Sequence, residues 1–518
     1  MEKMSDNLVP VKNTKASVID LGSNSVKMTN YNVDSHSSYK PYHQESVRVK
    51  LAEGKDRIIS DNRAEKTLET LKLFRNIVDF EQIDYVIAVA TSAVRDASNK
   101  DDFIGRIRLE TGFDFKVLSE HEEALFSYAG AIRSLNLPSV VFFDIGGGSL
   151  EIVYSKNFEI QSVLSLPLGS LRLTEQFSSG SDFSEADISN MRSYIRKCLP
   201  SRESLGLSGS DTVMVGVGGT LRALAKYEQA YDHYPLTKLH NYSMSCESLE
   251  LLSQYFLSRT TQEITKIESM GTGRAYTVQA GSMVISELVN LLGFQSLVVS
   301  AHGLREGTLS LSLQYPDDFV AHKIDAEHVQ DLIHISCQPE PVSEYVGDIV
   351  NLLFVMELIT DKERILLAHA TAQIDKLSSF RDVDNVLYMI LDDDSLLSHR
   401  EQLIVALSLI YSKKKKKAEV LIARFEKILK QPDRKSIKKI SSVVSLCDIF
   451  HKTRTLVKPK SESSSSLSLD VYASKNTFPE VLFQQVCSRM ENVLGITIKS
   501  KIYYGQSGYA PQGQQEMP

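Results

Sequence analysis

One short motif occurs twice in this chain, each time directly after an apolar run. Residues 20–25 read Asp-Leu-Gly-Ser-Asn-Ser and follow the apolar segment 16–19, and residues 144–149 read Asp-Ile-Gly-Gly-Gly-Ser and follow the apolar segment 140–143. The shared pattern, Asp-(Leu/Ile)-Gly-x-x-Ser, predicts a buried strand, an Asp at the strand end and a tight Gly/Ser turn. Two copies indicate a duplicated α/β unit whose two turns face one cleft.

These turns have the composition of phosphate-binding loops. Glycines let backbone N–H groups approach an anion, and Ser or Asn side chains add further donors. The Asp at each strand end can hold a metal ion or its waters. The alternative is that both are ordinary strand–turn connections. The candidate phosphate-binding residues of the two loops are Gly22, Ser23, Asn24, Ser25, Gly146, Gly147, Gly148 and Ser149.

Length and composition predict a large intracellular protein of several domains. A chain of 518 residues is too long for one core and should divide into three or four domains. The chain has no run of about 18 apolar residues, so no transmembrane helix is predicted. The first fifteen residues are polar and contain no apolar signal core. The five cysteines are far apart and odd in number, which fits buried thiols in a reducing compartment. We therefore expect a cytoplasmic protein without a membrane partner.

The net charge of −7 conceals a basic block. Residues 413–460 contain sixteen Lys or Arg against four acids, so the rest of the chain is strongly acidic. A basic block on an acidic protein indicates a polyanionic partner, although a solvated helix face is the simpler alternative. No nucleic acid is expected. The candidate distal polyanion-binding residues are Lys413, Lys414, Lys415, Lys416 and Lys417.

The pattern along the chain changes near residue 325. Before it, strand and helix signals alternate, and Gly-rich or polar segments follow the strands, as in α/β units built on mainly parallel strands. After it, helical periodicity dominates to about residue 450. A Lys/Pro/Ser-rich segment, 458–466, reads as a linker, and short strand and helix signals follow to residue 504.

The motifs together resemble the exopolyphosphatase / guanosine pentaphosphate phosphatase family, in its long form. The matching segments occur in family order and cover residues 16 to about 310, namely 20–25, 91–99, 122–124, 144–149 with Glu151, 218–220 and 303–307. Three departures are Glu120 where the family usually has Gly, His302 in the loop before Gly303, and the absence of any His-Asp dipeptide from the chain.

The resemblance implies the fold and the domain boundaries. It predicts an α/β protein with two actin-like (ribonuclease H-like) domains, residues 1–134 and 135–322, around a phosphate-binding cleft. An all-α HD-like domain, residues 323–457, would lack the metal-binding His-Asp pair and act as a binding or scaffold domain. A small α/β domain, 467–504, and a disordered tail, 505–518, would complete the chain. Long family members are commonly dimers, so a homodimer is expected.

The resemblance also assigns catalytic residues. It places the general base at Glu123, with Glu122 as the alternative. A carboxylate there suits removal of a proton from a water that attacks a phosphoanhydride. Arg95 can fork onto two phosphate oxygens, although a surface salt bridge with Asp96 or Asp102 is the simpler explanation.

The remaining candidates would hold metal and phosphate. The family pattern favours Asp144 and Glu151 as ligands of Mg²⁺, with Asp20 as a further candidate and K⁺ as an additional candidate activator. An Asp that caps its own loop is the alternative. Further phosphate-binding candidates are Thr91 and the third Gly-rich strand end, Gly218, Gly219 and Thr220, which could instead be a site of close packing.

The leading functional hypothesis is an exopolyphosphatase that releases orthophosphate from the end of inorganic polyphosphate. A guanosine pentaphosphate 5′-phosphohydrolase is the closest alternative, since both substrates end in a phosphoanhydride. An actin-like kinase or ATPase fits the acidic pair 122–123 less well. A non-catalytic polyphosphate or alarmone sensor is the fourth hypothesis, and the presence of Glu123, Arg95 and Asp144 argues against it.

Overall fold

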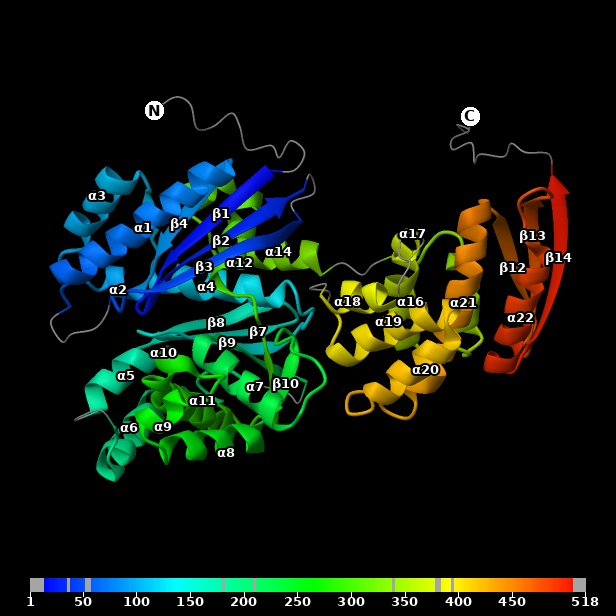
Figure 1. The fold of residues 1–518 in the computed structure, drawn as a ribbon. Helices are drawn as coiled ribbons and strands as arrows, with labels where there is room; N and C mark the ends of the chain where they lie inside the picture. Colours follow the sequence, from blue (N-terminus) through cyan, green and yellow to red (C-terminus); the bar gives the residue numbers. More distant parts are fainter. Residues whose placement is uncertain are drawn as a thin grey trace. The chain divides into compact units, whose positions relative to one another are not determined.

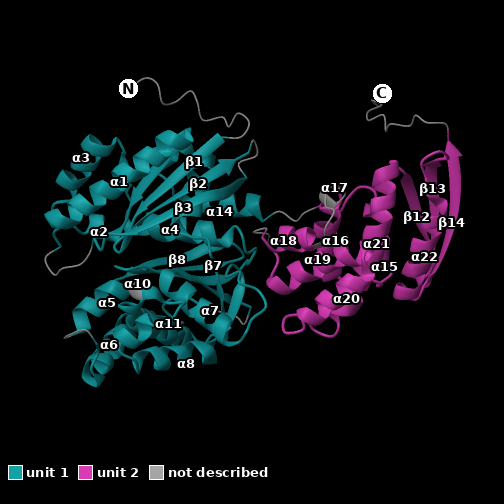
Figure 2. Cartoon of the chain, viewed as in Figure 1, with its two compact units in different colours: residues 1–337 teal, residues 338–518 magenta. Residues whose placement is uncertain are grey.

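The computed structural model describes residues 14–34, 38–51, 57–178, 182–207, 211–337, 341–377, 383–392 and 396–505. The chain forms two compact units, residues 1–337 and 338–518 (Figure 2). The first unit contains two β-sheets with helices, and the second contains a group of helices followed by a small sheet (Figure 1).

The first lobe of unit 1 is built on a five-stranded sheet of order β3-β2-β1-β4-β5. Its strands are β1 Thr14–Leu21, β2 Ser25–Val33, β3 Tyr39–Arg48, β4 Tyr85–Ala90 and β5 Phe115–Val117. Its helices are α1 Asp61–Glu81, α2 Ser92–Arg95, α3 Lys100–Thr111 and α4 Glu120–Ile132.

The second lobe is built on a six-stranded sheet of order β10-β11-β9-β6-β7-β8. Its strands are β6 Val140–Ile145, β7 Leu150–Lys156, β8 Glu159–Leu166, β9 Val213–Gly218, β10 Tyr242–Ser245 and β11 Ser296–Val299. The helices of this part are α5 Ser170–Phe177, α6 Glu185–Cys198, α7 Gly219–Tyr231, α8 Cys246–Leu257, α9 Thr261–Thr265, α10 Gly271–Ala275, α11 Val278–Leu292, α12 Leu304–Gln314, α13 Pro316–Val320 and α14 Ala326–Ser336.

The two sheets repeat one topology. The order β3-β2-β1-β4-β5 corresponds to β8-β7-β6-β9-β11, and each pair of neighbours runs in the same relative direction in both sheets. The two motif copies are therefore equivalent hairpin turns, β1–β2 and β6–β7. Across these hairpins Asp20 is paired with Lys27, and Asp144 is paired with Glu151.

Alternating side chains of β1 explain the layers of unit 1. Ile19 and Leu21 belong to a core shared with α1 and α3, whereas Ala16 and Val18 belong to a core shared with α4, α12 and α14. That second core also contains Phe142 of the other sheet, so these helices lie between the two sheets. A strand with both faces buried lacks the alternation of apolar and polar residues, and in segment 16–19 the one polar residue, Ser17, is itself buried.

Glycines let α4 and α12 approach at backbone distance. A Cβ added at Gly307 would lie 1.8 Å from the carbonyl oxygen of Phe126, and one added at Gly130 would lie 2.0 Å from that of Gly303. The close crossing fixes the start of α4 relative to the second lobe, and Glu123 lies at that start.

Unit 2 begins with helices and ends with a three-stranded sheet of order β12-β13-β14. Its helices are α15 Gly347–Val355, α16 Asp361–Ala372, α17 Ile374–Leu377, α18 Val383–Leu391, α19 His399–Lys413, α20 Lys415–Arg424, α21 Asp433–Thr453 and α22 Glu480–Leu494. Its strands are β12 Leu456–Ser463, β13 Ser466–Ser474 and β14 Thr497–Gly505.

Two boundaries differ from those expected from the sequence. Segment 458–466, predicted as a linker, forms most of β12 and its turn into β13. β12 is an edge strand, where Pro459 is tolerated and exposed lysines are common, so its composition resembles that of a linker. The first compact unit also extends beyond residue 322, because α14 packs into the core shared with α4. Residues 506–518 of the predicted disordered tail lie outside the described residues.

Candidate functional site

A cavity of about 160 Å³ lies between the two lobes at the equivalent hairpin turns. Both turns close in the same way, because Gly22 N–H donates to the Ser25 carbonyl at 3.1 Å and Gly146 N–H donates to the Ser149 carbonyl at 3.0 Å. Most of the residues predicted from the sequence line this cavity, namely Asp20, Gly22, Ser23, Asn24, Ser25, Thr91, Glu123, Asp144, Gly146, Gly147, Ser149, Gly218 and Gly219.

Four predicted site residues do not line the cavity. Glu151 is buried behind it on β7, where its Oε1 accepts a hydrogen bond from Ser165 Oγ at 3.2 Å. Thr220 is buried, and its side chain occupies the space beside Gly281. Gly148 lines a neighbouring hollow. Arg95, the fourth of these residues, contacts Glu123, which does line the cavity.

Arg95 and Glu123 form an ion pair at the start of α4. Arg95 Nη1 donates to Glu123 Oε2 at 2.8 Å and to the Leu118 carbonyl at 2.9 Å. Both side chains are largely buried, with 15% and 12% of their surfaces exposed. Among the described residues, the buried Nε of Arg95 has no hydrogen-bond partner. Arg95 therefore contacts Glu123 and Leu118, whereas the simpler explanation expected a surface salt bridge with Asp96 or Asp102.

Glu123 has the properties of a general base at neutral pH. Burial raises its pKa to about 7, the Arg95 guanidinium opposes this rise, and the carboxylates of Asp144 and Asp20 add to it. An efficient base has a pKa near the working pH, where it is deprotonated and still accepts a proton readily.

Glu122 has a different environment. It completes a capping box with Ser119, and its carboxylate lies 3.2 Å from Lys116 Nζ and 3.1 Å from His322 Nδ1. Although burial raises its pKa, the Ser119 N–H and Lys116 outweigh this effect and lower it. Glu122 therefore stabilises the start of α4, and it does not line the cavity.

The cavity is also lined by four basic side chains that the sequence motifs did not predict as site residues, namely Lys27, Arg222, Arg274 and Arg305. Burial lowers the pKa of Arg274 to about 10, with repulsion from Arg222 and Arg48. Arg305 donates to Thr29 Oγ1 at 2.8 Å, across the lobes. Lys27 is two residues beyond the first loop and Arg305 belongs to the segment 303–307, so their proximity to a motif could have predicted both as site residues. Arg274 lies near none of the motifs, and the sequence pattern did not predict it.

The acidic residues differ in their ability to hold a metal ion. Asp20 Oδ2 lies 3.7 Å from Lys27 Nζ, so its charge is already compensated. Asp144 and Glu151 are neighbours across β6 and β7, and burial raises the pKa of both carboxylates; for Glu151, Glu123 and Asp144 add to the rise. Two buried carboxylates suit Mg²⁺, which often takes one or two protein ligands together with substrate phosphates. The described residues contain no group of three or more His, Cys, Asp or Glu placed to hold a metal alone.

The five candidate lysines lie in unit 2, at the end of α19 and the start of α20. Lys413 Nζ pairs with Asp448 at 2.5 Å, and Lys417 Nζ pairs with Asp384 at 2.8 Å. Lys414, Lys415 and Lys416 are exposed. In the described part of the chain, no helix is long and apolar enough to cross a membrane.

Fold and site together define a two-lobed α/β protein with two equivalent glycine-rich turns and a largely buried carboxylate, Glu123, at the cavity between the lobes. A model of the Ppx/GppA phosphatase family matches residues 31–315, which is more than half of the chain. The chain therefore belongs to the Ppx/GppA phosphatase family, and the expected actin-like α/β lobes are confirmed. The relation of the helical part of unit 2 to HD proteins stays a prediction.

Curated relatives match between 54% and 69% of this chain. Exopolyphosphatase 1 of Mycobacterium bovis is 28% identical over 311 residues, 59% of this chain and 90% of the relative. The guanosine-5′-triphosphate,3′-diphosphate pyrophosphatase of Vibrio vulnificus is 25% identical over 385 residues, 69% of this chain and 71% of the relative. A bifunctional 3-dehydroquinate synthase/phosphatase of Fusobacterium nucleatum is 26% identical, but the chain spans only 44% of that relative's length.

Solved structures give the same assignment. The crystal structure of an exopolyphosphatase from Cytophaga hutchinsonii is 27% identical with a TM-score of 0.55, over 58% of this chain and 98% of that chain. The Aquifex aeolicus member of the Ppx/GppA family is 26% identical with a TM-score of 0.51, over 59% of this chain and 99% of that chain.

Proposed function

We propose that unit 1 is an exopolyphosphatase, which hydrolyses the terminal phosphoanhydride of inorganic polyphosphate and releases orthophosphate. The observation that carries this proposal is the position of Glu123, a buried carboxylate with a pKa near 7, in a cavity that two glycine-rich loops and four basic side chains also line. Such a cavity combines a proton acceptor with charges that compensate phosphate oxygens.

The chemistry follows from these positions. The N–H groups and hydroxyls of the two loops bind the terminal phosphoryl oxygens, and Lys27, Arg222, Arg274 and Arg305 hold the phosphates behind it. Glu123 accepts a proton as a water oxygen attacks the terminal phosphorus. The bridging P–O bond breaks, and its electron pair leaves with the shortened chain.

In this proposal Arg95 acts through Glu123, because its Nη1 donates to the Glu123 carboxylate and orients it. Asp144 and Glu151 would hold Mg²⁺, which supplies charge compensation to the phosphoryl oxygens when bound. K⁺ remains a candidate activator. Asp20 fits this role less well because of its pair with Lys27.

Guanosine pentaphosphate is the second candidate substrate. The similarity to the Vibrio vulnificus pyrophosphatase, which extends over 69% of this chain, supports it. The exposed Lys414, Lys415 and Lys416 of unit 2 favour polyphosphate instead, since a run of basic side chains suits a partner that carries many negative charges. We propose that the helical part of unit 2 is an HD-related binding domain rather than a second catalytic one.

A phosphate-release assay tests the proposal directly. Long-chain polyphosphate, guanosine pentaphosphate and ATP are compared with and without Mg²⁺, using the full chain. We expect release from polyphosphate at the highest rate and dependence on Mg²⁺. Higher kcat/KM for guanosine pentaphosphate would assign the alternative function, and no release from any substrate by wild type would refute an enzymatic role.

A further inference from the structure

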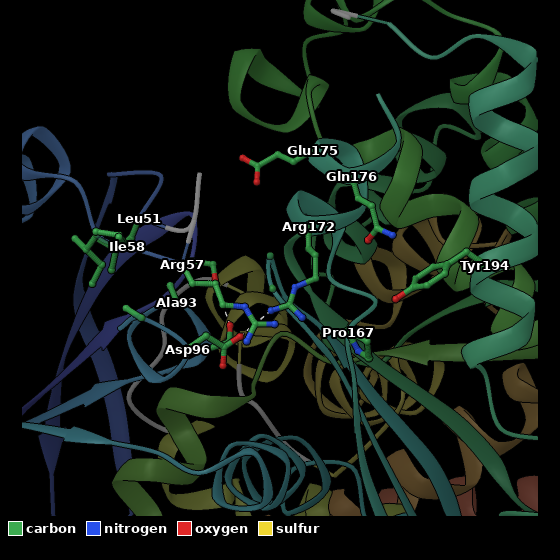
Figure 3. A pocket seen from close by; sticks show the side chains of 16 residues that line it. Leu51, Arg57, Ile58, Ala93, Asp96, Pro167, Arg172, Glu175, Gln176 and Tyr194 are labelled. Atoms are coloured by element: carbon green, nitrogen blue, oxygen red, sulfur yellow. Dashed lines mark hydrogen bonds and ion pairs between the residues drawn. The ribbon is translucent and has the colours of Figure 1, made fainter. Parts of the chain in front are cut away.

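A second hollow has a volume of about 600 Å³ and shares lining residues with the catalytic cavity. Figure 3 shows side chains that line this hollow. Both lobes contribute to it, because Arg57 and Asp96 come from the first lobe and Arg172 and Tyr194 from the second. Ser23, Ser92 and Gly147 line both spaces. The second hollow therefore begins at the loop tips that would grip the terminal phosphate.

Only small side chains separate the two spaces at these shared residues. Ser23 Oγ and Ser92 Oγ are 3.0 Å apart. A Cβ added at Gly147 would lie 3.1 Å from Ser23 Cβ, and one added at Gly148 would lie 2.5 Å from Ser92 Oγ. The two spaces are therefore separated at this point by hydroxyl groups and glycine backbone, and no larger side chain stands among the shared residues.

The two spaces differ in how many charged side chains line them. The first cavity has the basic wall formed by Lys27, Arg222, Arg274 and Arg305, together with the carboxylates of Asp20, Glu123, Asp144 and Glu306. The described lining of the second hollow has two arginines, Arg57 and Arg172, and two acids, Asp96 and Glu175. Its other lining includes the apolar side chains of Leu51, Ile58, Ile59 and Pro167. Four basic side chains can hold several phosphates of a chain, whereas two arginines suit one small anion.

We propose that the second hollow is the exit site for product orthophosphate, with Arg172 as its main ligand. This inference rests on the proposed function. An enzyme that keeps the shortened chain on the basic wall must release orthophosphate by another route, since the chain occupies the path by which it entered. Orthophosphate passes between the loop tips, and no bond forms or breaks in this step.

The ion pair between the lobes gives this exit a defined anion site. Arg172 Nη2 lies 2.8 Å from Asp96 Oδ2, and the side chains of Arg57 and Arg172 converge on Asp96 (Figure 3). Phosphate is a strong acceptor for guanidinium groups, so orthophosphate competes with the Asp96 carboxylate for Arg172. Loss of Arg172 should weaken phosphate binding, and loss of the Asp96 charge should strengthen it.

A tryptophan reporter tests this binding without turnover. The chain contains no Trp, and Ile58 lines the hollow with 57% of its surface exposed, so Ile58→Trp introduces a single tryptophan whose emission can be excited selectively over that of the 21 tyrosines. Orthophosphate titration of the full chain should give a saturable fluorescence change. With Arg172→Gln added, the apparent Kd should rise about ten-fold or more, as expected for one charge-assisted hydrogen bond. With Asp96→Asn added, it should fall.

The control is Arg108→Gln, an exposed arginine of the same lobe as Asp96 that lies 4.0 Å from Asp114. It should leave the Kd unchanged. A Kd that Arg172→Gln leaves unchanged would overturn the proposal. Weaker binding in both Arg172→Gln and Asp96→Asn would also overturn it, because it would mean that the pair matters only for holding the lobes together.

Product inhibition gives the second test. If orthophosphate binds in the exit while the chain remains bound, added orthophosphate lowers the apparent kcat for polyphosphate, and Arg172→Gln weakens this effect. Inhibition of the wild type that raises only the apparent KM would mean that orthophosphate leaves by the substrate's route, and the exit proposal would be wrong while the proposed function stands. A wild type without turnover would refute the function itself, and the reporter titration would still judge the anion site.

Discussion

Glu123→Gln should abolish turnover and at the same time stabilise the protein above neutral pH. The two effects have one cause. The pKa of Glu123 is raised from its ordinary 4.5 to about 7, chiefly by burial, so the folded protein binds this proton more tightly than the unfolded chain does. Stability is therefore lost as the pH rises from the unfolded to the folded pKa.

The magnitude follows from the pKa shift. Each unit corresponds to about 1.4 kcal/mol, so the ionised carboxylate costs about 3 kcal/mol of unfolding free energy above pH 7. Glutamine has nearly the same shape and no charge. Arg95 still donates to the Leu118 carbonyl, at 2.9 Å, after the substitution. The variant should match the wild type near pH 4.5 and exceed its stability by about 3 kcal/mol at pH 8.

Urea unfolding of the full chain at several values of pH between 4.5 and 8.5 measures this difference, and phosphate release measures turnover, which should fall by about 10²-fold or more. Glu120→Gln is the matched control, because Glu120 is an exposed acid in the same helical turn. A Glu123→Gln variant less stable than the wild type at pH 8, or a difference that does not change with pH, would refute the reasoning. Normal turnover in this variant would exclude Glu123 as the base.

Four further predictions follow from the same contacts. Because Arg95 lowers the pKa of Glu123, Arg95→Gln should shift the acidic limb of the pH–kcat/KM profile to higher pH. Arg95→Lys should lower turnover although it keeps the charge. An unshifted limb in Arg95→Gln together with full activity in Arg95→Lys would place Arg95 outside the site. Glu122→Gln should retain turnover but cost about 1–3 kcal/mol in urea unfolding, since it breaks the cap and the Lys116 pair; loss of turnover in a folded protein would make Glu122 the base. Gly307→Ala, whose Cβ would meet the Phe126 carbonyl at 1.8 Å, should lower both thermal stability and kcat, whereas Gly347→Ala, with open space, should not lower kcat. Replacement of Lys414, Lys415 and Lys416 by Gln should raise KM for long polyphosphate and make that KM less dependent on salt concentration, and KM for guanosine pentaphosphate should not change. The same salt dependence of KM in variant and wild type would show that these lysines are only solvated.

The sequence by itself determined the two glycine-rich hairpins. A buried strand, an Asp and a Gly/Ser turn are local features, and the repeated pattern at residues 20–25 and 144–149 predicted equivalent loops, which the matching turn hydrogen bonds of Gly22 and Gly146 confirm. Family resemblance added Glu123 and the actin-like lobes. Where composition misled, as at β12, an edge strand has the same proline and lysine content as a linker.

The tertiary structure decided what the local pattern leaves open. Glu122 and Glu123 are adjacent in sequence, and only the packing of α4 places one against Lys116 and the other in the cavity. Likewise, the basic wall brings together Lys27 of β2 and Arg274 of α10, which lie far apart in the chain. Local spacing specifies strands and turns, but burial, charge compensation and pKa depend on neighbours that only the folded lobes supply.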